Sequence, residues 1–122
     1  MDERPSLGMR LKGNDMRHFF ESYEWWKLQL ANNLRLSGPN TTGKEVVVGK
    51  ARDNSFMMAY SPYGHTFSLN MEGLHVDAIQ VQWFHAATGT FVEGGIRERE
   101  REMLFDPPGD PQRGNDWVMV AR

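Results

Sequence analysis

The feature that most constrains the fold is residues 55–94, where short apolar runs alternate with turn-forming residues. Ile79, Val81 and Trp83 alternate with glutamines, which is the two-residue period of a half-buried strand. Turn-forming residues separate the runs at positions 61–64, 71–73 and 87–89. Several short strands joined by tight turns predict an antiparallel sheet.

The flanking residues extend this pattern. Residues 34–44 predict a short extended piece and then a loop, and residues 45–51 and 56–60 predict a hairpin. Further strands are expected at residues 96–105 and 116–121. About seven or eight strands, spaced roughly ten residues apart, are typical of a two-sheet sandwich. We therefore expect an all-β fold, an antiparallel β-sandwich over residues 34–122.

Residues 14–33 have a helical period instead. Apolar side chains recur there at steps of three and four residues, namely Met16, Phe19, Phe20, Tyr23, Trp26 and Leu30. This predicts one amphipathic helix that leads into the sandwich, preceded by a polar arm over residues 1–13. Because burying one large side chain is worth about 1.5–3 kcal/mol, the apolar face must pack on this chain's own sheet or on a partner domain.

The composition excludes several classes of protein. The chain has no cysteine, which removes disulfides, thiol catalysis and cysteine-ligated zinc. Fourteen basic and sixteen acidic residues give a net charge of −2, so we expect no nucleic-acid partner. No apolar run is long enough to span a membrane, and the first residues lack the apolar region of a secretory signal. The chain is expected to be cytoplasmic or a piece of a longer protein.

The polar residues form no recognisable catalytic set. The histidines, at positions 18, 65, 75 and 85, lack the spacing and the carboxylate partner of a metal site, so no metal or cofactor is expected. The aspartates lie at predicted turns, where they serve as turn formers. The alternating charges of residues 97–102 are interpreted as a solvated strand edge that blocks edge-to-edge association. The alternative is an arginine row for an acidic ligand.

One turn carries candidate ligand-binding residues. Tyr63 lies in a turn beside His65 and has no predicted core to enter. An exposed aromatic ring can stack on the apolar face of a sugar, although a turn tyrosine can also pack over the end of a sandwich. The candidate ligand-binding residues are Tyr63, His65 and His85.

Four motifs in order carry a family resemblance: FMMAYSPYG at residues 56–64, VQWFHAATG at 81–89, FDPPG at 105–109 and NDWVMV at 115–120. Together with the helical segment they resemble, over residues 14–121, the C-terminal domain behind the catalytic barrel of apiosidase-like glycoside hydrolases. That domain is often labelled the collagen-binding domain of a collagenase. The chain departs from the pattern at His85-Ala86, where such proteins usually have Asp-Pro, and at Glu24, where they have proline.

The resemblance implies a β-sandwich accessory domain whose parent proteins are often secreted or periplasmic. It also implies that the catalytic carboxylates lie in the barrel, which this chain lacks, so no catalytic residue is expected here and the chain is not expected to be an enzyme. We expect a non-catalytic domain that braces a barrel, or pairs with another copy of itself, through Phe20, Trp25 and Trp26. The alternative is a self-standing module that binds polysaccharide or collagen through Tyr63 and His65. A complete hydrolase is the third and weakest interpretation.

Overall fold

The computed structural model of the chain describes residues 25–122, which form an all-β structure. Within these residues there are two short 3-10 helices, η1 (Trp25–Lys27) and η2 (Asn32–Leu34), and nine strands. The strands are β1 (Leu28–Leu30), β2 (Arg35–Ser37), β3 (Val47–Ala51), β4 (Met57–Ser61), β5 (Phe67–Asn70), β6 (Ala78–His85), β7 (Phe91–Glu98), β8 (Glu102–Phe105) and β9 (Trp117–Ala121).

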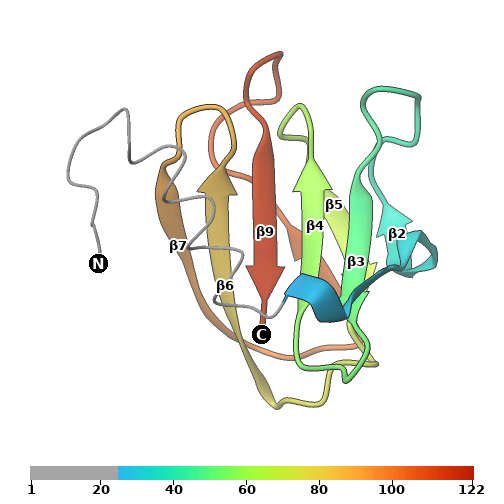
Figure 1. Cartoon of the computed structure of the whole chain (residues 1–122). Helices are drawn as coiled ribbons and strands as arrows, with labels where there is room; N and C mark the ends of the chain where they lie inside the picture. The colour runs from blue at the N-terminus through green and yellow to red at the C-terminus, as the bar shows by residue number, and fades with distance from the viewer. Residues whose placement is uncertain (1–24) are drawn as a thin grey trace.

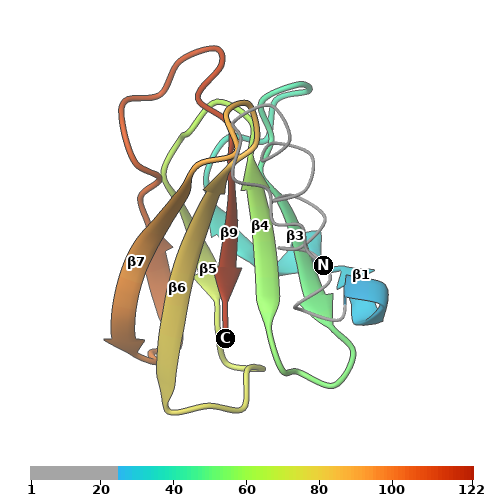
Figure 2. The ribbon, with the colours of Figure 1, turned by 60° about the vertical axis from the view of Figure 1, so that its left-hand side comes forward.

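The strands form two antiparallel sheets that face each other (Figures 1 and 2). The large sheet has six strands in the order β1-β3-β4-β9-β6-β7, and the small sheet has three in the order β2-β5-β8. The last strand, β9, lies between β4 and β6, so the C-terminal residues complete the centre of the large sheet. The predicted hairpin is confirmed, because Val48 of β3 pairs with Ala59 of β4.

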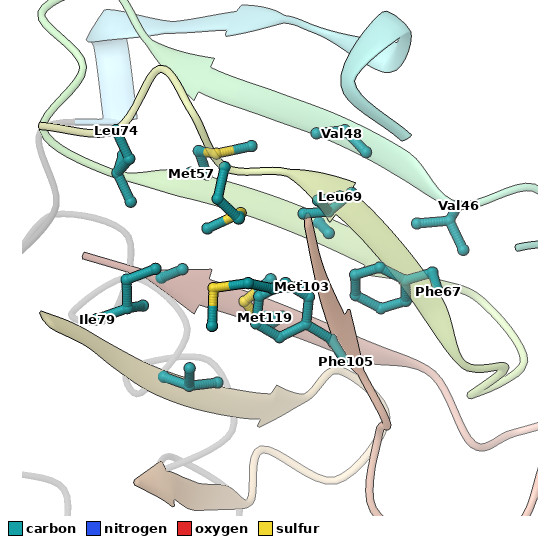
Figure 3. Close-up of a cluster of buried hydrophobic side chains, with 14 of the residues drawn as sticks. Val46, Val48, Met57, Phe67, Leu69, Leu74, Ile79, Met103, Phe105 and Met119 are labelled. Atoms are coloured by element: carbon teal, nitrogen blue, oxygen red, sulfur yellow. The ribbon is translucent and has the colours of Figure 1, made fainter. Parts of the chain in front are cut away.

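The main core lies between the two sheets (Figure 3). Alternate residues of each strand point into it, which is the expected consequence of the two-residue period. Phe67 of β5 packs against Phe105 of β8 at 5.8 Å between ring centroids, and edge-on against Trp83 of β6 at 6.2 Å. Both phenylalanines are fully buried, so aromatic packing joins the small sheet to the large one.

The outer face of the large sheet, turned away from the small sheet, is also apolar. A second group of buried residues gathers there, and we call it the outer cluster: Ala51, Phe56, Met58, Phe84 and Val120. Its members come from β3, β4, β6, β9 and the β3–β4 turn. The small sheet, in contrast, turns polar residues such as Ser68 and Asn70 away from the core.

The helix predicted for residues 14–33 is wrong where the structure describes it. Residues 14–24 lie outside the described residues, and Leu28–Leu30 form strand β1, which pairs with β3. Local periodicity cannot reveal the long-range pairing with β3 that makes these residues a strand. The pairing continues past the end of β1, since the backbone N–H of Ala31 donates to Val48 O at 2.8 Å. No helix within residues 25–122 is long and apolar enough to cross a membrane.

The prediction of a single strand over residues 96–105 is also wrong, because β7 ends at Glu98 and β8 begins only at Glu102. At the break Arg99 N–H donates to Asp77 O, and its guanidinium donates to Val76 O at 2.7 Å. Arg97 donates to Leu104 O at 2.8 Å and lies over the Phe105 ring. These two arginines therefore hold main-chain carbonyls and do not form one row for an acidic ligand.

Candidate functional site

The candidate ligand-binding residues lie at one end of the sandwich. Ser61 of β4 and His85 of β6 both pair with Trp117 of β9, so these three strands reach the same edge of the large sheet. The connections at residues 62–66, 86–90 and 106–116 therefore gather at that end, at the top of Figure 1. We call this end the loop end.

Tyr63 and His65 form a half-buried ring pair at the loop end. Their ring centroids lie 6.3 Å apart and their planes are 29° apart, which is a stacked arrangement. The Lys44 ammonium, from the β2–β3 connection, lies 5.6 Å from the Tyr63 ring centroid, within the range of a cation–π contact. The structure thus brings Tyr63 and His65 together as predicted, and it adds a cation from a distant part of the sequence.

The backbone of this turn is fixed from several sides. Gln112 N–H donates to Tyr63 O at 2.9 Å, and Ser61 Oγ donates to His65 O at 3.0 Å. Gly64 has φ +79, and a Cβ there would lie 2.5 Å from Asn115 Nδ2. Only glycine adopts that conformation and closeness without strain. The Tyr63–His65 pair therefore stands on a rigid turn.

Asn115 organises the longest loop at this end. Its Nδ2 donates to Pro108 O at 3.0 Å and to Asp110 O at 3.1 Å. Its Oδ1 accepts from the indole N–H of Trp117 at 2.8 Å. One side chain thus ties the loop to itself and to the start of β9. This role is not visible in the sequence, because an asparagine in a loop predicts only a turn former.

His85 also lies at the loop end, but its hydrogen bonds stay within its own turn. Its ring meets the Trp117 indole edge-on at 4.6 Å, and its Nδ1 accepts from Thr88 N–H at 3.2 Å. That hydrogen bond places the proton of the neutral ring on Nε2. The contacts of His85 are therefore those of a turn-stabilising residue, distinct from the Tyr63–His65 pair.

Two buried polar atoms near the loop end have no hydrogen-bond partner within the described part of the chain. They are Nδ1 of His65 and Oδ1 of Asp116. The other Asp116 oxygen accepts from the Tyr60 hydroxyl at 3.2 Å. Burial raises the pKa of Tyr60, and the charge of Asp116 raises it further. The phenol therefore stays protonated and keeps donating to the carboxylate.

A groove of about 380 Å³ lies on the outer face of the large sheet. It runs over β1, β3, β4 and β9 and is almost entirely apolar; its lining is Leu28, Gln29, Leu30, Val47, Val48, Gly49, Met58, Ala59, Tyr60 and Val118. Leu30 is 75% exposed beside it. The sequence does not reveal this groove, because the predicted helix over residues 14–33 includes residues 28–30.

The candidate partner-domain residues are only partly described. Trp26 lies in η1, next to β1, and is 57% exposed. Trp25 is the first residue of η1, and Phe20 lies outside the described residues. Within residues 25–122 no group of three or more histidine or acidic residues is placed to hold a metal ion.

This architecture defines the chain as an antiparallel two-sheet β-sandwich domain. Residues 35–122 match the family model described as "Putative collagen-binding domain of a collagenase", and the chain belongs to that family. Comparison with curated proteins gives no match. The resemblance found in the sequence motifs is therefore confirmed at the level of the family.

Solved structures share the fold. One, titled "Glycoside hydrolase", is 12% identical and superposes with a TM-score of 0.75 over 98% of this chain and 27% of its own. Another, a family 5 glycoside hydrolase from Bacteroides vulgatus, is 13% identical with a TM-score of 0.75, covering 90% of this chain and 23% of its own. This chain thus spans about a quarter of each neighbour, and no catalytic barrel is present in residues 25–122.

Proposed function

We propose that this chain is a non-catalytic accessory domain of a glycoside hydrolase-like protein, which packs against the catalytic domain and braces it. The observation that carries the proposal is the apolar groove on the outer face of the large sheet. Family membership and the small share of each glycoside hydrolase neighbour that the chain spans agree with it.

The groove has the chemistry of a protein interface and not that of a sugar site. Leu30, Val47 and Tyr60 present apolar surface that is 75%, 39% and 37% exposed. Monomeric proteins rarely leave such contiguous apolar surface open unless a partner covers it. Sugars need several hydrogen-bond partners, whereas Gln29 and the Tyr60 hydroxyl are the main polar groups here. Trp26, an exposed aromatic residue next to β1, would extend the contact, since aromatic anchors dominate interface energies.

The test uses the glycoside hydrolase catalytic domain encoded nearest to this chain in its genome, expressed separately. We expect the two to form a complex in calorimetry and the catalytic domain to melt at a higher temperature in it. Leu30→Asp places a charge in the groove and should abolish both effects. The chain alone should release no reducing sugar from aryl glycosides or polysaccharides.

Leu104→Asp is the matched control, because Leu104 is 57% exposed but lies on β8 of the small sheet. It should leave the complex intact. Hydrolysis by the chain alone, or a complex that is equally weakened by both substitutions, would contradict the proposal.

A second candidate function rests on the loop end. The Tyr63–His65 ring pair, with Lys44 above it, offers a stacking surface, a cation and an imidazole whose Nδ1 has no partner within residues 25–122. This chemistry fits an acidic or neutral polysaccharide. The test is a pull-down against insoluble plant polysaccharides, pectin and fibrillar collagen. Loss of binding in Tyr63→Ala but not in Trp26→Ala would support it, and binding that survives Tyr63→Ala would exclude this site.

A further inference from the structure

The connection between β2 and β3 carries a sequence motif that has no visible role in the fold. Asn40-Thr41-Thr42 has the form Asn-X-Thr, in which X is any residue except proline. Of the asparagines in the sequence, only Asn40 is followed two residues later by serine or threonine. This is the acceptor pattern for N-linked glycosylation, which joins a glycan to the asparagine amide.

The side chains of this motif are exposed and unused within residues 25–122. Asn40, Thr41 and Thr42 are all exposed, and no described residue forms a hydrogen bond with the Asn40 amide or the Thr42 hydroxyl. Other asparagines use their side-chain amides in hydrogen bonds that hold strands and turns, namely Asn32, Asn54, Asn70 and Asn115. The fold therefore gives Asn40 no task of this kind.

A turn-forming role does not account for Asn40 either. In such a role the Oδ1 of an asparagine accepts from the backbone N–H two residues later, as Asn70 does from Glu72 N–H at 2.9 Å. Among the described residues, Asn40 makes no such bond with Thr42. The turn closes instead through Lys44 N–H, which donates to Thr41 O at 2.9 Å. The ordinary structural reason for an asparagine before a turn is therefore missing.

The backbone presents the motif clear of the sheets. Val46 N–H donates to Pro39 O at 3.3 Å, which closes the base of the connection, so residues 40–45 project beyond it (Figure 1). A Cβ placed on Gly43 would have no other atom within 4 Å. The surroundings of the motif are thus open enough for an enzyme to reach both side chains.

We propose that Asn40 is the acceptor of an N-linked glycan. In this reaction Asn40 Nδ2 displaces the pyrophosphate of a lipid-linked oligosaccharide from C1 of the first sugar. The Nδ2–C1 bond forms, the C1–O bond breaks with its electron pair leaving on the pyrophosphate, and the amide loses one proton. The transferase recognises the Thr42 hydroxyl, so both of these exposed side chains take part.

This inference does not depend on the proposed function. The β2–β3 connection lies at the loop end, since Val47 at the start of β3 pairs with Tyr60, and the Lys44 ammonium lies over the Tyr63 ring. An N-linked glycan is bulky and solubilising, so a glycan on Asn40 would keep the loop end in solvent. A partner domain would then be left with the outer face of the large sheet, where the groove lies.

The test uses the full chain, folded and purified from a host without N-glycosylation. It is incubated with a eukaryotic single-subunit oligosaccharyl transferase and a lipid-linked oligosaccharide, and its intact mass is measured. The chain should gain the mass of one oligosaccharide, which peptide N-glycosidase should remove. Thr42→Val should abolish the gain. Thr41→Val is the matched control, because Thr41 is also exposed but occupies the unread middle position, and it should keep the gain.

A synthetic peptide of residues 36–44 shows whether the motif is accepted outside the fold. If the peptide is modified and the folded chain is not, the fold does not present Asn40 and the proposal is wrong. If neither is modified, the motif is not an acceptor. If Thr42→Val keeps the full gain in mass, the glycan is attached elsewhere, which also overturns the proposal.

Discussion

Asn115→Ala is the substitution whose cost can be worked out most directly from the structure. Asn115 makes three hydrogen bonds, one of them from the indole N–H of Trp117, a residue that is only 6% exposed. Removing the amide leaves that N–H buried without a partner, which costs about 1–3 kcal/mol. Asp110 is exposed and Pro108 is half-buried, so water can replace the amide at these two carbonyls and each adds only about 0.5 kcal/mol.

The expected loss is therefore about 2–4 kcal/mol in the free energy of unfolding. A domain of this size is stable by about 6–18 kcal/mol, so the loss is a large fraction of the total. Urea unfolding followed by circular dichroism measures it as a lower midpoint with an unchanged slope. Asn70→Ala is the matched control, because Asn70 accepts one hydrogen bond from Glu72 N–H in an exposed turn. It should cost less than about 1 kcal/mol.

A double-mutant cycle with Trp117→Phe isolates the indole bond. In that background Asn115→Ala should cost about 1–2 kcal/mol less, since the buried donor is already gone. The reasoning is refuted if the two substitutions are additive, or if Asn115→Ala costs no more than Asn70→Ala.

Three further predictions concern the turns. Gly64→Ala should destabilise the domain by at least about 1 kcal/mol, because φ is +79 and its Cβ would meet backbone 2.7 Å away; urea unfolding measures this. Arg99→Ala should cost about 1–3 kcal/mol through the lost carbonyl contacts, whereas Arg101→Ala, in an exposed ion pair, should stay within about 0.5 kcal/mol. Hydrogen bonds from Lys27 and then Ser55 lower the pKa of Asp53 from 3.8 to about 2. The ionised Asp53 carboxylate therefore stabilises the fold, and this contribution should disappear as the pH falls from about 4 to 2. In acid titrations of unfolding, Lys27→Met should weaken this dependence of stability on pH.

The strands were predictable from the sequence because each contains its own signal. The alternation of apolar and polar residues located β5 and β6, and the turn residues located their ends. β3, β4 and β9 were found in the same way, within a residue or two of their observed bounds. Successive residues of a strand point to opposite faces of the sheet. Where only one of these faces is buried, burial alone therefore produces the alternating pattern.

The misplaced elements are those whose pattern fits two structures. Leu28 and Leu30 flank Gln29 as in a strand, yet Trp26 and Leu30 also have helical spacing, and only pairing with β3 decides between them. The alternating charges run unbroken through residues 97–102, so periodicity could not show that the guanidinium of Arg99 ends the strand by binding carbonyls.

The loop-end site was half predictable for a similar reason. Tyr63 and His65 are two residues apart in one turn, so their proximity was expected from the sequence. Lys44 and Asn115 come from other connections, and no local pattern brings them to that turn. The register of Ser61 and His85 with Trp117 decides which loops meet.

The apolar outer face of the large sheet indicates where this domain would need a covering partner. In a two-layer sandwich without a partner, the outer faces are solvated. The outward-pointing residues are polar and alternate along each strand with the buried ones, as Ser68 and Asn70 do in the small sheet. The large sheet instead carries Met58, Phe84 and Val120 outward, which is the pattern of a sheet covered on both faces. The open groove over β1, β3 and β4 is the part of this face where apolar side chains such as Leu30 and Val47 stay exposed, so it is the part that the proposed partner would cover.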